Sequence, residues 1–191
     1  MKRIKLFEEF ENNSLSELIN KLKSYDIPCD LWGTGQSKTV RYLLKELEEK
    51  ECYLEEKDGL ITRYIEFVGI KVFFRKDDGE VLKLKEDRQE FNDGRSRKRN
   101  MPSSVSEKMK AGEDPLSSAV RGVKEELGID IDESQLQKYS DLYYDGGSLS
   151  YPGLITKYKG HRYVCYLTPE QFEPNGYVEI QEDKKTFFTW S

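Results

Sequence analysis

The sequence predicts a mixed α/β fold built around one central helix, with a small helical extension at the N-terminus. Residues 60–75 are rich in Ile, Val, Phe and Tyr, which favour strands. Residues 115–127 carry apolar side chains at helical spacing between strong capping signals. Further strand patterns follow this helix, so strands flank it on both sides, as in a layered α/β domain.

Composition supports a folded protein with a densely charged surface. The 191 residues, 36% hydrophobic and 35% charged, suffice for one medium domain or for a core domain with an appendage. Nine Phe, twelve Tyr and two Trp argue for a packed core. The net charge of −5 gives no support for wholesale nucleic-acid binding.

Cysteine and histidine usage narrows the chemistry. Cys29, Cys52 and Cys165 form no CxxC pair, which indicates neither a zinc site nor a disulfide framework. His161, the only histidine, lies in a strand-like segment without a nucleophile elbow, which favours a structural role. No apolar run suits a signal peptide or a membrane span, so we expect a cytoplasmic protein that does not associate with membranes.

Two short helices are predicted in the N-terminal extension, which we place at residues 1–58, before a main domain at residues 59–191. The first covers residues 14–25, with Ser14 as N-cap and a glutamate three places on completing a capping box. The second covers residues 37–50 and carries apolar residues at helical spacing.

The segment WGTGQSKT lies between these helices and only superficially suggests a phosphate-binding loop. That loop needs glycines where this sequence has Trp32 and Ser37. We therefore expect a turn that leads into an N-capped helix.

The main domain begins with strand patterns at residues 60–67 and 68–75. Asp77, Asp78 and Gly79 then predict a hairpin turn into a strand at residues 80–84. A polar loop is expected at residues 92–100. Further strands are predicted at residues 137–144, 154–158, 161–168 and 184–190.

The helix at residues 115–127 has well-defined ends. Asp114 is a predicted N-cap, Pro115 suits the first helical position, and Gly128 suits the position after the last turn. Arg121 and Glu125 are i,i+4 neighbours, so the guanidinium can fix the carboxylate rotamer. Leu116, Ala119, Val120, Val123 and Leu127 form the apolar stripe.

Two adjacent glutamates, Glu125 and Glu126, lie near the end of this helix. Acidic pairs are often simply solvated, but negative charge at a helix C-terminus opposes the helix dipole. A bound divalent cation would relieve that mismatch.

The segment AGEDPLSSAVRGVKEELGID, residues 111–130, resembles the Nudix box, G-x5-E-x7-R-E-U-x-E-E-x-G-U, in which U is a bulky aliphatic residue. The match is ungapped. The matching positions are Glu113, Arg121, Val123, Glu125, Glu126, Gly128 and Ile129.

Two positions depart from that pattern. Glu107 stands where the box begins with glycine, and Gly122 replaces the glutamate that in this family commonly helps to bind metal. Glu107 lies in SVSEKM, which the Nudix fold places beside the box helix, so it could compensate. The chain also resembles a divergent Nudix-like subgroup with an SEKM…GED…RGVxEELG signature and an N-terminal helical extension, including the segment SYPGLITKY at residues 150–158.

The resemblance implies a Nudix-like α/β/α sandwich with a mixed β-sheet, and Mg²⁺- or Mn²⁺-dependent hydrolysis of a diphosphate bond in a nucleotide. It implies Glu125 and Glu126 as catalytic metal ligands, Glu107 as a third ligand and Arg121 as a positioning catalytic residue. Glu113 is expected to be structural. A general base often lies outside the box in this family, and the candidates are Glu173, Glu179 and Glu182.

Several alternatives stay open at this stage. Arg95, Arg97 and Arg99 in the polar loop are either solvated or contact a substrate phosphate, and an RNA 5′ end is a less favoured substrate. Gly122 favours a second hypothesis, a catalytically weak Nudix-like module that binds a nucleotide as a sensor or scaffold. The N-terminal helices could supply a homodimer interface.

Overall fold

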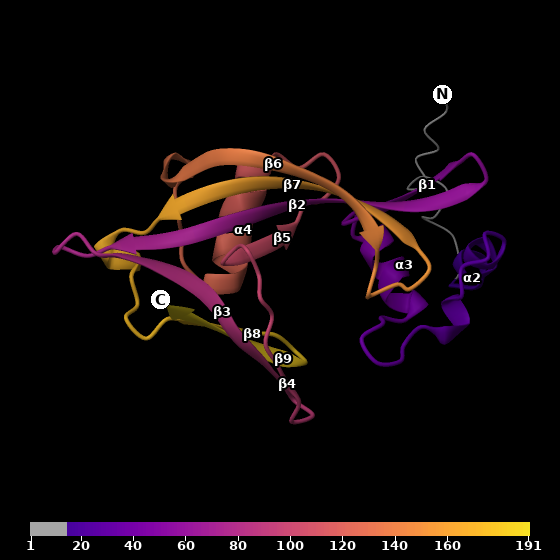
Figure 1. Ribbon diagram of the computed structural model, residues 1–191, viewed down its shortest axis with the longest axis horizontal. Helices are drawn as coiled ribbons and strands as arrows, with labels where there is room; N and C mark the ends of the chain where they lie inside the picture. The colour runs from indigo at the N-terminus through magenta and orange to yellow at the C-terminus, as the bar shows by residue number, and fades with distance from the viewer. Residues whose placement is uncertain (1–14) are drawn as a thin grey trace. The chain divides into compact units, whose positions relative to one another are not determined.

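The structure is a computed structural model that describes residues 15–191 (Figure 1). A nine-stranded sheet has the strand order β6-β7-β2-β3-β9-β8, with β1 and β5 pairing to β2 and β4 pairing to β3. The α-helices are α2 (Leu15–Lys23), α3 (Val40–Glu48) and α4 (Pro115–Leu127). The strands are β1 (Tyr53–Lys57), β2 (Leu60–Arg75), β3 (Val81–Phe91), β4 (Ser96–Arg97), β5 (Val105–Lys108), β6 (Leu136–Gly147), β7 (Ile155–Tyr166), β8 (Tyr177–Ile180) and β9 (Lys184–Trp190). The predicted mixed α/β class is therefore confirmed.

The chain forms two compact units. The first comprises the described residues up to Glu66 together with Lys108–Gly112 and Leu142–Lys159. The second comprises Phe67–Glu107, Glu113–Asp141 and Gly160–Ser191, and it contains α4, β8 and β9. The division into residues 1–58 and 59–191 stays a prediction.

Strands β2 and β7 are each continuous, whereas the sequence patterns divided each of them into two. Glycines near the expected breaks serve close packing instead. A Cβ at Gly69 would lie 2.7 Å from Ser103 Oγ, and one at Gly160 would lie 2.5 Å from the Phe67 ring. These glycines therefore allow another side chain to pack closely against the strand without interrupting it, which is one of the uses of glycine within a strand.

The hairpin between β2 and β3 and the bounds of β9 agree with the sequence patterns. Gly79 has a φ of 89°, and Asp78 Oδ1 accepts a hydrogen bond of 2.9 Å from the Glu80 amide, which closes the turn. Four short strands, β1, β4, β5 and β8, were not predicted, and β4 lies within the expected polar loop. Three of these carry candidate site residues: β4 carries Arg97, β5 carries Glu107 and β8 carries Glu179.

In the first unit, α2 packs against α3 (Figure 1). Leu18 and Leu22 of α2, and Leu43 of α3, are fully buried, as their helical spacing indicated. The predicted cap residue Ser14 lies outside the described residues. The second helix begins at Val40 rather than Ser37, because Ser37 Oγ instead accepts hydrogen bonds from two amides of the preceding turn.

A buried carboxylate, Glu46, joins three basic side chains in this unit. Glu46 and Arg63 are 5% and 3% exposed and form an ion pair. Lys38 and Lys108 approach Glu46 Oε1 at 2.8 and 2.7 Å. Burial alone would raise the pKa of Glu46, but the three cations outweigh it and lower the pKa from 4.5 to about 2.

We expect the stability of the protein to fall in acid because of Glu46. A carboxylate whose pKa is lowered by folding stabilises the fold fully above its ordinary pKa, and this contribution disappears as pH falls from about 4.5 towards about 2. The loss should be about 1–3 kcal/mol in the free energy of unfolding, measured by urea denaturation across this range.

The matched variants are Glu46→Gln and Glu48→Gln, the latter at an exposed position of the same helix. Glu46→Gln should already be destabilised at neutral pH, because Arg63 loses its buried partner, and its stability should then depend less on acid. An acid profile of Glu46→Gln identical to that of Glu48→Gln would contradict the role given to Glu46.

Other expectations about residue roles can be compared with the structure. His161 lies in β7 at 6% exposure, and its Nδ1 atom is 2.9 Å from Asp141 Oδ1, which fits a structural residue. Cys29, Cys52 and Cys165 are buried free thiols. Within the described part of the chain, no helix is long and apolar enough to cross a membrane.

Candidate functional site

The helix α4 has the ends that its sequence predicted. The Asp114 carboxylate accepts hydrogen bonds from the amides of Leu116 and Ser117, at 2.9 and 3.1 Å. Gly128 ends the helix with a φ of 74°, in the left-handed region that glycine adopts at little cost. These caps fix the register in which the helix presents its charged face.

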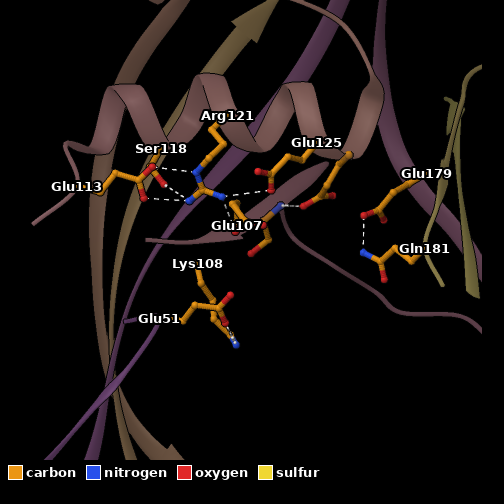
Figure 2. A network of polar contacts seen from close by, with 11 residues as sticks. Glu51, Glu107, Lys108, Glu113, Ser118, Arg121, Glu125, Glu179 and Gln181 are labelled. Carbon is orange, nitrogen blue, oxygen red and sulfur yellow. Dashed lines mark hydrogen bonds and ion pairs between the residues drawn. The ribbon is translucent and has the colours of Figure 1, made fainter. Parts of the chain in front are cut away.

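Arg121 is the centre of a carboxylate network on α4 (Figure 2). Its Nε and Nη2 atoms donate to the two oxygens of Glu113, each at 2.9 Å. Its Nη1 atom donates to Glu107 at 3.0 Å and to Glu125 at 3.2 Å. These bonds, led by the one to Glu113, raise the pKa of Arg121. Arg121 therefore orients Glu107 and Glu125, two of the three carboxylates expected to bind metal, and Glu113 anchors Arg121.

Glu126 lies in a different environment from Glu125. The Glu125 side chain is 53% exposed, whereas Glu126 is half-buried and accepts a hydrogen bond of 3.2 Å from the Ser106 amide of β5. Burial, followed by the negative charges of Glu179 and Glu107, raises the pKa of Glu126 well above its usual value. Carboxylates from α4, β5 and β8 thus gather near one another, and the positive charge of Arg99 does not outweigh their effect on Glu126.

Glu107 occupies the space beside Gly122. A Cβ built at Gly122 would lie 2.7 Å from Glu107 Cβ and 3.2 Å from its Cγ. Real Cβ atoms do not approach so closely, so any side chain at position 122 would have to displace Glu107. The strand residue Glu107 and the helix residue Gly122 therefore fit each other as a pair.

Strand β8 brings one of the three general-base candidates to this site. β8 packs against α4, and its residue Glu179 repels Glu126. Figure 2 shows Glu179 on its own strand beyond the Glu125 end of the helix. Glu173 and Glu182 are exposed, and their backbone carbonyls receive the bonds from Trp190 and Asn92.

The arginines of the polar loop divide into two groups. Arg95 pairs with Asp93 at 2.7 Å, and its side chain is 70% exposed. Arg97 donates to the Gln89 side chain, and Arg99 forms a two-pronged ion pair with Glu86. Arg99 also lies near Glu126 and Glu179. Burial alone would lower the pKa of Arg99, but Glu86, followed by the negative charges of Glu126 and Glu179, outweighs it and raises the pKa. The structure thus brings Arg99 near the carboxylates, with Arg97 beside Arg99, whereas Arg95 is exposed.

The carboxylates provide donors of the type that magnesium prefers. Among residues 15–191, no three His, Cys, Asp or Glu side chains are arranged to hold a metal ion by themselves. Mg²⁺ is usually bound by one or two carboxylates together with water and substrate phosphates rather than by a complete protein cage. Glu126 and the neighbouring carboxylates of Glu107 and Glu179 fit that mode of binding.

No family model and no curated protein matches this chain. The chain is similar to several solved structures, each at low sequence identity. An Ap4A hydrolase from C. elegans is 16% identical, with 66% of this chain and 79% of the other covered, at a TM-score of 0.38. A MutT/nudix family protein from Enterococcus faecalis is 13% identical, with 90% and 54% covered, at 0.44. The E. coli dihydroneopterin triphosphate pyrophosphohydrolase is 18% identical, with 65% and 78% covered, at 0.38.

Proposed function

We propose that this chain is a Nudix-type pyrophosphohydrolase that cleaves a diphosphate bond in a nucleotide and requires Mg²⁺ or Mn²⁺. The environment of Glu126 carries the proposal. Burial and two neighbouring carboxylates disfavour its charge, and a divalent cation would reverse that effect. The match of residues 111–130 to the Nudix box adds to this argument.

Each residue of the site has a role in this proposal. Glu125 and Glu126 hold the metal with Glu107 as a third ligand, and Arg121 orients Glu107 and Glu125. Bound divalent cations would neutralise phosphoryl charge and acidify the attacking water. We assign Glu179 as the general base, because a carboxylate beside Glu126 could accept the proton of that water on one of its oxygens.

Gly122 favours the second candidate, a nucleotide-binding module with little or no catalytic activity. Its lack of a side chain removes one carboxylate from the helix itself, and the remaining ligands come from α4 and β5. In this alternative the same carboxylates and arginines would hold a nucleotide without turning it over. A cytoplasmic location and a homodimer formed through the N-terminal helices stay predictions.

The decisive experiment incubates the purified full chain with Mg²⁺, Mn²⁺ or EDTA and a panel of substrates, and separates the products by chromatography. The panel holds canonical and deaminated nucleoside triphosphates, ADP-ribose, dinucleoside polyphosphates and capped RNA. We expect metal-dependent cleavage of at least one compound. Binding of a nucleotide without turnover would favour the sensor. If the chain neither bound nor hydrolysed any compound, both candidate functions would be contradicted.

A further inference from the structure

Three cations lie close together at the candidate site: Arg97, Arg99 and Lys184, here called the cation cluster. Arg99 and Lys184 also lie near Glu179. Lys184 begins β9, and its sequence pattern did not mark it as a site residue. Burial, followed by the positive charge of Arg99, lowers the pKa of Lys184, and Arg97 adds to the effect. The three cations are therefore close enough to repel one another.

The strand register explains why these side chains meet. Residues paired directly across antiparallel strands point to the same face of a sheet, and so do residues two apart on one strand. Lys184 therefore shares a face with Thr186, whereas Lys185 faces the other way. Across β4, β3, β9 and β8, the paired residues on this face are Arg97, Gln89, Thr186 and Glu179.

Buried polar side chains support this arrangement. Gln89 and Thr186 are each 1% exposed, and Gln89 Nε2 donates to Thr186 Oγ1 at 3.3 Å. Gln89 Oε1 accepts from Arg97 Nε and Nη2 at 3.1 and 2.6 Å. Arg99 is fixed in turn by the buried carboxylate of Glu86. The buried side chains of Gln89 and Glu86 thus fix the positions of the two guanidinium groups, as in a site arranged for a ligand.

The cluster retains unused positive charge. Among residues 15–191, the half-buried amine of Lys184 has no hydrogen-bond or ion-pair partner, and neither arginine donates through Nη1. Partial burial of an unpaired ammonium group is unfavourable unless an anion approaches it. Arg99, which is paired with Glu86, also lies near Glu126 and Glu179. Unused donors of the cation cluster thus lie near the carboxylates of the candidate site, which suits a ligand that carries both metal and phosphate.

We propose that Arg97, Arg99 and Lys184 form a phosphate subsite for a group beyond the two phosphates of the cleaved bond. This inference rests on the proposed function and narrows its substrate class to nucleoside triphosphates or longer polyphosphates. A diphosphate that ends in a neutral sugar would leave this subsite without its anion. Arg95 has no part in it, because that side chain is exposed and paired with Asp93.

Binding of inorganic tripolyphosphate to the full chain, measured by calorimetry in EDTA, tests the subsite without metal or turnover. Lys184→Met should weaken the affinity about tenfold, the value of one charge-assisted hydrogen bond. Lys184→Arg should keep it, which separates loss of charge from loss of fold. The matched control is Lys185→Met, whose side chain is exposed on the other face. Equal affinities of Lys184→Met and Lys185→Met would overturn the subsite.

Kinetics then test the substrate class. Lys184→Met should raise KM for a nucleoside triphosphate about tenfold, keep kcat within about twofold, and leave KM for ADP-ribose unchanged. An equal effect on both substrates would overturn the assignment to triphosphates. The two proposals fail separately. If the protein binds tripolyphosphate through Lys184 but hydrolyses no nucleotide, the subsite stands and the proposed function fails. If the protein is active but its binding and kinetics do not depend on Lys184, the proposed function stands and the subsite fails.

Discussion

Glu126→Gln should lower the rate of metal-dependent nucleotide hydrolysis by about 10²–10³-fold, the range seen when one group that stabilises transition-state charge is removed. The amide keeps an oxygen that can accept the bond from Ser106, so the local geometry should persist. The neutral side chain, however, binds a divalent cation poorly. The rate is measured with the substrate that the panel identifies, at saturating Mg²⁺.

The same variant should be no less stable than the original protein when both are metal-free. Burial and the charges of Glu179 and Glu107 disfavour the Glu126 carboxylate, and a neutral amide avoids this repulsion. Mg²⁺ should raise Tm of the original protein but have little effect on Tm of Glu126→Gln, because stabilisation by a ligand follows its binding.

Glu133→Gln provides the control, since Glu133 is exposed and lies at the start of a short 3₁₀ helix. It should match the original protein in rate and in its response to Mg²⁺. If Glu126→Gln hydrolysed nucleotides at the original rate and still gained stability from Mg²⁺, the assignment of Glu126 as a ligand would be wrong.

Local patterns predicted α4 well because its determinants are local. The cap at Asp114, the glycine at position 128 and the i,i+4 contact of Arg121 with Glu125 each depend on residues within one or two turns. Such interactions can be inferred from spacing alone. The helix bounds and the charged face consequently agree with the sequence prediction.

The partners of α4 depend on strand pairing between distant residues, which spacing does not determine. β8 has only four residues, too few for a clear alternating pattern, yet it brings Glu179 near Glu126. Alternation along β9 places Lys184 and Lys185 on opposite faces of the sheet. Which of the two lysines shares a face with Gln89 becomes known only from the pairing of Thr186 with Gln89. A strand register can fix a site that no contiguous motif reveals.

The exchange of carboxylate between Gly122 and Glu107 lies between these cases. The sequence showed a glutamate missing from the helix and another in SEKM, but not that the two positions compete for one space. The distance of 2.7 Å from a Cβ at position 122 to Glu107 Cβ establishes that competition. The family pattern favours a glutamate at position 122, whereas this competition for space makes a glutamate there unfavourable.

Gly122→Glu, which introduces the glutamate of the Nudix-box pattern, should therefore lower both the stability and the activity of the protein. Glutamate gains about 1 kcal/mol over glycine in helix propensity. Overpacking against the Glu107 strand should cost about 1–3 kcal/mol and displace Glu107, so we expect a net loss of stability in urea denaturation. Activity should fall at least about tenfold, because a misplaced ligand disturbs the geometry of the whole site.

The reciprocal variant, Gly122→Glu with Glu107→Gly, tests whether this is a true exchange. Removing the Cβ at position 107 gives the new glutamate room, so the double variant should recover most of the stability and activity that Gly122→Glu loses. The coupling between the two changes should exceed about 1 kcal/mol in a double-mutant cycle. Gly146→Glu is the control, since nothing lies within 4 Å of a Cβ at that position. Additive effects at positions 122 and 107 would show that the two residues act independently, and Glu107 would then lose its place as the substitute for the box glutamate.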